Sequence, residues 1–140
     1  MFYFVVHHLR WAARVPGLPQ FFDALLVAGT FMFRRPRLAA MDALEVEVLR
    51  MPGVRLKAHR FGGIEFVEKE GRELGHMHGH GLLDVAVGRL VARALLCEGR
   101  VCPHHIFPDS RWVSFQIESE ADVPFALELV KIADKAGGNC

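Results

Sequence analysis

The chain has 140 residues and a formal net charge of +1, which is enough for one domain with its own apolar core and gives no general attraction to nucleic acid. Hydrophobic residues make up 51% of the sequence and charged residues 24%, as in ordinary globular proteins. The three cysteines have no framework spacing, which excludes a disulfide-held scaffold and favours a reducing, cytoplasmic compartment.

Residues 1–37 form a predicted apolar N-terminal arm. The opening Met1–Val6 suggests a short strand or a docking arm, and Phe21–Phe33 suggests a helix of 13 residues, shorter than the roughly 20 that cross a bilayer. Three arginines follow this helix: Arg34, Arg35 and Arg37. Two interpretations stay open. The helix packs on the domain core or in a homodimer interface, or residues 19–37 make a peripheral contact with a membrane.

Residues 38–140 form a predicted α+β domain, in which a small antiparallel sheet has helices packed on one side. Spacing and breaker residues predict a helix over 38–49, strands over 54–59, 64–67 and 72–78, a helix capped by Asp84 and ending at Gly99, a strand over 112–118, and a last helix that begins at Ser119 or Asp122 and ends at Gly137. On the 72–78 strand, Leu74, His76 and His78 are expected on one face, and Glu73, Gly75 and Met77 on the other.

The segment from Glu73 to Gly81 holds the most informative pattern of the chain. His76, His78 and His80 alternate with small or apolar residues, so an extended backbone would direct all three imidazoles to one side. His104 and His105 follow in a proline-containing loop. This clustering predicts a histidine-lined pocket at the hairpin and the loop.

Several motifs of the chain occur together in a known family. They are Phe61–Phe66, Arg72–Gly79, Leu83-Asp84, Gly99-Arg100, Pro103–His105, Pro108–Ser110, Trp112–Phe115 and Ser119–Val123. In their order and spacing, over about residues 44 to 136, the chain resembles the small bacterial and fungal luciferase-domain family. The family's label implies light-emitting oxidation, but the resemblance assigns no catalytic residue to this chain. The chain has no glycine fingerprint for a flavin and no G-x-S-x-G nucleophile motif.

Three functions are compatible with the histidines. The first is a zinc, nickel or iron site, such as that of a metal-dependent hydrolase or oxidase, with His76, His78 and either His104 or His105 as ligands. Its second-shell carboxylate or general base would be one of three residues: Asp84, Asp109 or Glu65.

The second function is a metal-free site that binds a small anion or transfers protons, because imidazole and guanidinium groups donate charge-assisted hydrogen bonds. Arg72, Arg100 and Arg111 would join the histidines in that site.

The third function, and the one that we favour from the sequence alone, is a non-enzymatic module that binds a small ligand or a partner protein. In this module the histidines of the pocket would pack and hydrogen-bond in the hairpin, and the Phe-rich arm would make a dimer or membrane contact. Trp112 and the pair Phe21-Phe22 would be anchors of that surface. The complete set of candidate ligand-binding residues is Arg72, His76, His78, Asp84, Arg100, His104, His105 and Trp112.

Overall fold

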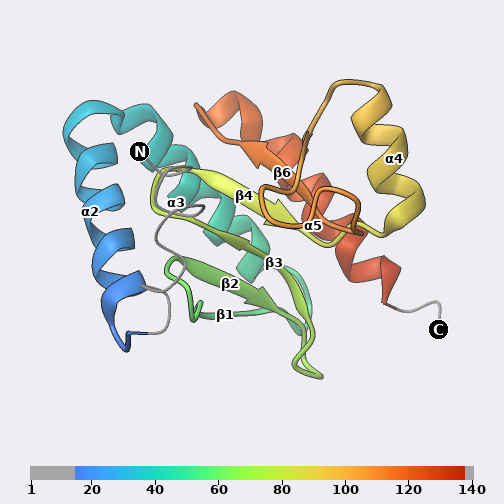
Figure 1. The fold of residues 1–140 in the computed structure, drawn as a ribbon, viewed down its shortest axis with the longest axis horizontal. Coiled ribbons are helices and arrows are strands. Elements are labelled where there is room, and N and C mark those ends of the chain that lie inside the picture. The colour runs from blue at the N-terminus through green and yellow to red at the C-terminus, as the bar shows by residue number, and fades with distance from the viewer. Residues whose placement is uncertain (1–14, 138–140) are drawn as a thin grey trace.

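The computed structural model describes residues 15–137, in which four α-helices and a six-stranded antiparallel sheet form an α+β fold (Figure 1). The elements are α2 (Leu18–Phe33), α3 (Arg35–Leu49), β1 (Arg55–Ala58), β2 (Ile64–Val67), β3 (Glu73–Met77), β4 (Leu82–Val85), α4 (Arg89–Cys97), β5 (Cys102–Pro103), β6 (Val113–Gln116), a 3-10 turn η2 (Glu120–Asp122) and α5 (Val123–Ala136). The predicted α+β class is confirmed. The predicted strand or arm at Met1–Val6 lies outside the described residues.

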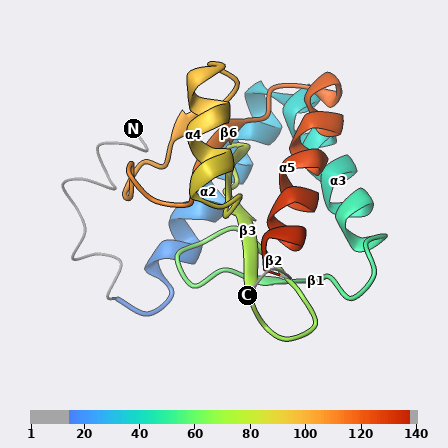
Figure 2. The same cartoon turned by 90° about the vertical axis from the view of Figure 1, so that its right-hand side faces the viewer.

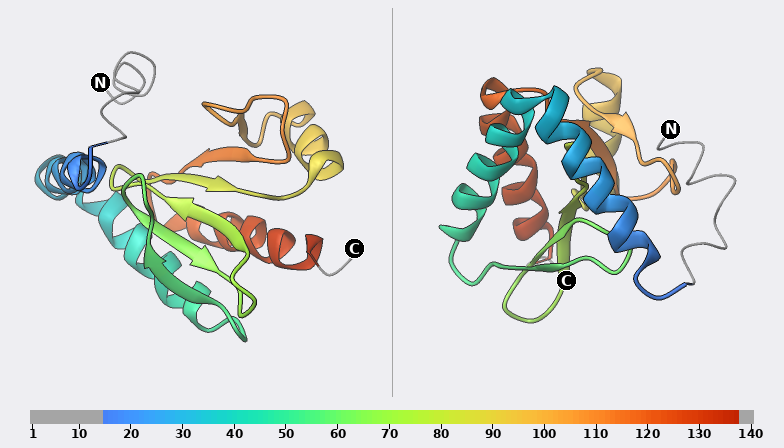
Figure 3. Two further views of the ribbon diagram at one scale, coloured as in Figure 1. Left: turned by 60° about the horizontal axis from the view of Figure 1, so that its bottom comes forward. Right: turned by 90° about the vertical axis from the view of Figure 1, so that its left-hand side faces the viewer.

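The strands lie in the order β1-β2-β3-β4-β6-β5, and every neighbouring pair is antiparallel. Helices α3 and α5 lie side by side against one face of this sheet, while α2 and α4 lie at opposite ends of the molecule (Figures 1 and 3). Seen along the long axis, α4 stands in front and α2 lies behind it (Figure 2).

The hydrophobic core fills the space between the sheet and the pair α3 and α5. Core side chains that are essentially inaccessible to solvent come from the strands and from both helices: Leu44, Val48, Phe66, Leu74, Leu83, Val85, Val113, Leu129 and Val130. Pro124 lies in the first turn of α5, where its missing N–H costs no helical hydrogen bond.

The predicted helix capped by Asp84 is wrong at its start. Residues Leu82–Val85 form β4, and α4 begins only at Arg89, after Gly88. All four β4 residues are buried, so the strand is covered on both faces and lacks the alternation that marks a half-exposed strand. The sequence pattern of β4 therefore resembles the start of the helix that follows.

The predicted parity of the 72–78 strand is also wrong at one end. Val67 pairs with Glu73 although Phe66 pairs with Gly75, so a bulge leaves Leu74 as the extra residue of β3. Leu74 consequently enters the core, while the Glu73 carboxylate lies beside the His76 ring.

Helix α2 attaches to the sheet through two turns that contain glycines. The amide of Gly79 donates to Asp23 Oδ1 at 2.8 Å, and the Thr30 hydroxyl donates to the carbonyl of Gly79 at 2.8 Å. A Cβ at Gly79 would lie 2.5 Å from Val27 Cγ2, and one at Gly62 would lie 2.7 Å from Asp23 Cβ. The helix therefore approaches the sheet too closely for any side chain at these two positions.

Replacing Gly79 with alanine is expected to weaken the attachment of α2, because the new methyl group would overlap Val27 and the Asp23 carbonyl. The expected loss is about 1–3 kcal/mol in the free energy of unfolding, measured by urea denaturation. Gly29→Ala is the matched control, since nothing lies within 4 Å of its added Cβ. This control should stabilise helix α2 by up to about 1 kcal/mol. Equal stability of the two variants would contradict the close approach.

Candidate functional site

The sheet face that does not pack on the core helices carries a row of polar side chains. In the strand register, each of the six strands contributes one member: Lys57, Glu65, His76, Asp84, Ser114 and Cys102. Directly paired residues of neighbouring strands share a face, so these six side chains lie in sequence across the sheet. The candidate site lies at the middle of this row.

The Asp84 side chain is the centre of the site and is completely buried. Its Oδ1 accepts a short hydrogen bond from the Ser114 hydroxyl. Its Oδ2 lies 3.4 Å from His76 Nε2, 3.5 Å from His78 Nε2, 3.5 Å from His105 Nδ1 and 3.9 Å from His104 Nε2. Four imidazoles thus surround one carboxylate oxygen.

Different segments supply these imidazoles. His76 is the register partner of Asp84 on β3. His78 opens the turn to β4, in which the amide of Gly81 donates to the carbonyl of His78. His104 and His105 follow β5 and extend over the polar face of the sheet. The antiparallel pairing of β3 with β4 and of β6 with β5 brings these segments together.

Hydrogen bonds fix the orientation of two of the rings. His76 Nδ1 lies 2.7 Å from Glu73 Oε1, which requires a proton on Nδ1 because a carboxylate only accepts. His104 Nδ1 accepts from the amides of Ile106 and Phe107, each at 3.1 Å. A neutral His104 therefore carries its proton on Nε2, the nitrogen nearest to Asp84.

Aromatic rings enclose the cluster. His59 stacks on His76 with ring centroids 4.1 Å apart, and Trp112 lies 5.7 Å from His76 and 5.9 Å from His104. Phe107 stacks on the His104 ring at 5.6 Å and is 59% exposed. The loop that carries His104 and Phe107 thus forms the solvent side of the site.

Burial and charge act in opposite directions on the central pair. Burial alone would lower the pKa of His76, but interactions with Asp84 and Glu73 outweigh it and raise that pKa to about 9. Burial alone would raise the pKa of Asp84, but the surrounding imidazoles hold it far below its usual range. In the metal-free protein at neutral pH, a charged His76 therefore faces a charged Asp84.

The histidines at the edge of the cluster are neutral at pH 7. Burial and the neighbouring imidazoles lower the pKa of His59 to about 4, and burial likewise lowers the pKa of His104 to about 4. The pKa of His80 is also lowered to about 4 by burial and by His78.

Other residues in the predicted set lie elsewhere. The Arg72 guanidinium donates to Glu68 and to the carbonyls of Ala133 and Asp134, at the end of α5. Arg100 stacks over Phe125 at 4.1 Å and lies 3.7 Å from Glu98.

Three further candidates for the metal site or the anion site, Glu65, Asp109 and Arg111, lie outside the cluster around Asp84. Glu65 pairs with Lys57 at 3.2 Å, next to His76 in the row. Asp109 and Arg111 are exposed. The His80 ring lies 5.9 Å from His78 but belongs to none of the potential ligand groups found among the described residues.

Sequence reasoning missed three contributors to the site. Ser114 was detectable in principle, since it alternates with Val113 and Phe115 on a predicted strand and so had to face away from the core. His59 carried no signal beyond its strand position. Glu73 was assigned to the wrong face because the bulge at Leu74 leaves no mark in the sequence.

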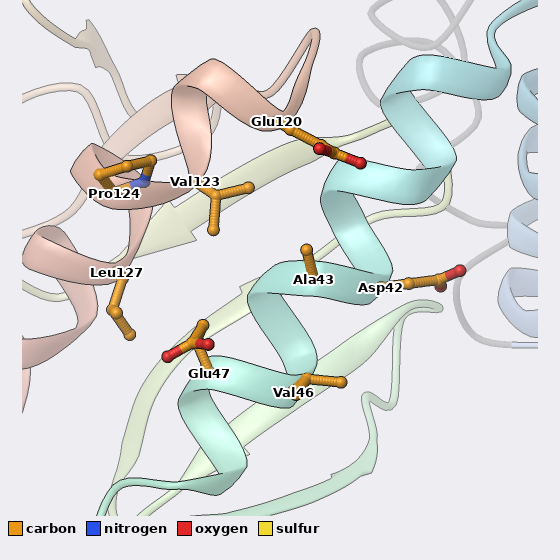
Figure 4. A pocket seen from close by; sticks show the side chains of 8 residues that line it. All are labelled: Asp42, Ala43, Val46, Glu47, Glu120, Val123, Pro124 and Leu127. Carbon is orange, nitrogen blue, oxygen red and sulfur yellow. The ribbon is translucent and has the colours of Figure 1, made fainter.

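A hollow between α3 and the start of α5 is separate from this site (Figure 4). Three carboxylates line it, from Asp42, Glu47 and Glu120. The other lining residues are Ala43, Val46, Val123, Pro124 and Leu127. No histidine of residues 15–137 lines this hollow, so it has no part in the histidine cluster of the polar face.

The histidine cluster around Asp84 lies in a segment of the chain that is similar to a known protein family. Residues 71–133 match the family model of the Luciferase domain. The resemblance that the motifs predicted over about residues 44 to 136 is confirmed for this part. The Luciferase-domain segment holds all four imidazoles around Asp84, together with Ser114 and Trp112, whereas α2, α3, β1 and His59 lie before it. No curated protein and no solved structure matches the chain.

The metal-free protein is expected to be most stable near pH 6.5. Below this value the unfolded chain takes up protons that native His59, His80 and His104, with pKa values near 4, do not bind, so stability falls towards pH 4. Each histidine contributes up to about 1.4 kcal/mol per pH unit in that window. Above pH 6.5 native His76 retains a proton that the unfolded chain loses, so its contribution declines as the pH rises through about 9.

Urea denaturation in the presence of a chelator, repeated from acidic to alkaline pH, measures this profile. His59→Gln and His104→Gln should each flatten the acidic side, because glutamine does not titrate. A profile that stays flat between about pH 8 and pH 5 would show that these rings are not held neutral in the native state.

Proposed function

We propose that this chain is a metal-binding domain that holds a divalent transition-metal ion between His76, His78 and Asp84. Three potential ligand atoms, one from each of these buried side chains, lie within 4.8 Å of one another. Two imidazoles and one carboxylate are a donor set that suits zinc or iron and leaves coordination positions open.

The distances at Asp84 Oδ2 carry this proposal. Both imidazole nitrogens lie 3.4–3.5 Å from this oxygen, which is longer than an ordinary hydrogen bond of about 2.7–3.2 Å. Ligand atoms at 2.0–2.1 Å from a tetrahedral zinc ion are separated from each other by about 3.3–3.4 Å. These two nitrogen–oxygen distances support an arrangement of the three side chains around one ion.

The outer hydrogen bonds support the same assignment. Glu73 holds the His76 proton on Nδ1, which leaves Nε2 as the nitrogen directed at Asp84 when the ring is neutral. A carboxylate that orients a histidine in this way is the usual partner of a metal-bound imidazole. Ser114 binds the other Asp84 oxygen and so fixes the rotation of the carboxylate.

His104 and His105 have different roles in the proposed site. His104 presents an N–H to Asp84 because its Nδ1 already accepts two backbone amides, so we assign it to positioning the carboxylate. His105 Nδ1, at 3.5 Å from Asp84 Oδ2, is the nearest source of a fourth donor. With His105 as the fourth donor a tetrahedral site would be closed, whereas without it one position would be open to water or a small ligand.

A small anion fits this geometry less well. The centre of the cluster is a buried carboxylate with a strongly lowered pKa, and its negative charge would repel a bound carboxylate or phosphate. The guanidinium group of Arg72, which such an anion would require, is directed at the end of α5.

Metal binding is expected at about one ion per chain. Untagged protein would be analysed by elemental mass spectrometry as purified, and then by calorimetric titration with Zn²⁺, Ni²⁺ and Fe²⁺. Asp84→Asn, which preserves the size of the side chain, and the double variant His76→Ala/His78→Ala should each lose about 100-fold or more in affinity, since each removes ligands.

His80→Gln is the matched control, because His80 neighbours His78 but contributes to none of the ligand groups. It should bind metal as the unaltered protein does. Far-ultraviolet circular dichroism would show that each variant is folded. Failure of the folded, unaltered protein to bind any of the three ions would reject the proposal, as would an equal loss of affinity in His80→Gln.

A further inference from the structure

Helix α2 presents an apolar surface to its surroundings. The exposed fraction is 82% for Phe33, 67% for Met32 and 61% for Phe21. Together with Leu25 and Phe31, which are 53% and 51% exposed, these residues define the α2 face. Large apolar side chains gathered along one helix in this way mark an interaction surface.

Two polar residues of α2 point inward instead. Asp23 and Thr30 both bind the backbone of Gly79, and Thr30 is the single buried residue of the helix. The contact with the sheet thus includes hydrogen bonds and close backbone approach at glycines, and it leaves the side chains of the α2 face exposed. Figure 3 (right) shows α2 running along the outer side of the molecule.

Charge is distributed very unevenly between this region and the rest of the chain. Residues 1–41 contain five arginines and one acidic residue, Asp23, whereas the other 99 residues contain 12 basic and 15 acidic residues. The carboxylate of Asp23 accepts a hydrogen bond from the Gly79 amide. Arg34 and Arg35 are exposed at the end of α2, and the Arg35 guanidinium lies 5.4 Å from the centre of the Phe31 ring.

We propose that the α2 face binds an anionic phospholipid surface. The helix would lie in the plane of the interface, with Phe21, Leu25 and Met32 at the boundary of headgroups and acyl chains and with Arg34 and Arg35 on lipid phosphates. Among the described residues, no helix is long and apolar enough to cross a membrane. The net negative remainder of the chain favours the orientation in which the α2 region faces the lipid.

A second copy of the chain suits this face less well. In a symmetric contact the α2 faces of two copies would bring Arg34 and Arg35 near the same arginines of the partner, and such like charges repel. The only acidic residue of α2 is Asp23, which already binds Gly79. Anionic headgroups supply negative charge at every position along the helix.

Co-sedimentation with vesicles tests the proposal on the full-length chain. Equimolar phosphatidylcholine and phosphatidylserine vesicles should retain the protein, while pure phosphatidylcholine vesicles should bind it at least about tenfold more weakly. Leu25→Ser/Met32→Ser should reduce binding to the anionic vesicles about tenfold or more, because it removes two apolar side chains that the lipid would bury. Arg34→Glu and Arg35→Glu should each reduce it about fivefold or more.

Two matched controls lie on α4, at the other end of the molecule. Leu90 is 82% exposed, so Leu90→Ser removes a comparable side chain outside the α2 face, and Arg93→Glu makes the same charge change on an exposed residue. Both should bind anionic vesicles as the unaltered chain does.

Several results would overturn the proposal. These are no binding to anionic vesicles, equal losses in the α4 controls, or self-association in sedimentation velocity that the Leu25→Ser/Met32→Ser variant abolishes without any vesicle binding. The last result would assign the α2 face to a second copy of the chain.

Discussion

The buried Asp84 carboxylate is the constraint on which the rest of this structure depends. A charge without solvent is tolerated only where other groups compensate it, and the Ser114 hydroxyl and four imidazoles gather around this one. To bring them there, the sheet must pair β4 with both β3 and β6 in a fixed register. The loop after β5 must also fold back over the sheet. The stability of the sheet and the proposed metal site therefore depend on the same residue.

The sheet separates two environments within one layer of backbone. Its apolar face packs on α3 and α5, and its polar face carries the row from Lys57 to Cys102. The bulge at Leu74 matters because it allows β3 to serve both environments: Leu74 enters the core while Glu73 and His76 remain together on the polar side. Without that extra residue, the carboxylate that orients His76 would lie on the opposite face.

Sequence reasoning could predict the fold class, most strands and the clustering of the histidines, since these depend on local period and on turn residues. It could not predict that Asp84 lies at the centre. Leu82–Val85 is covered on both faces, so its strand has no alternating pattern, and an aspartate before a helix resembles an N-cap. Nor could it predict the orientation of α2, because the decisive contacts at Gly62 and Gly79 join segments far apart in the chain.

The two edges of the sheet have a consequence for how copies of this protein meet. One edge is β5, a strand of two residues that includes Pro103, which has no amide hydrogen to donate. The other edge is β1, where Arg55 and Lys57 are exposed. Short, proline-containing and charged edges resist the addition of a strand from another molecule. The sheet is thus protected against edge-to-edge addition of further strands.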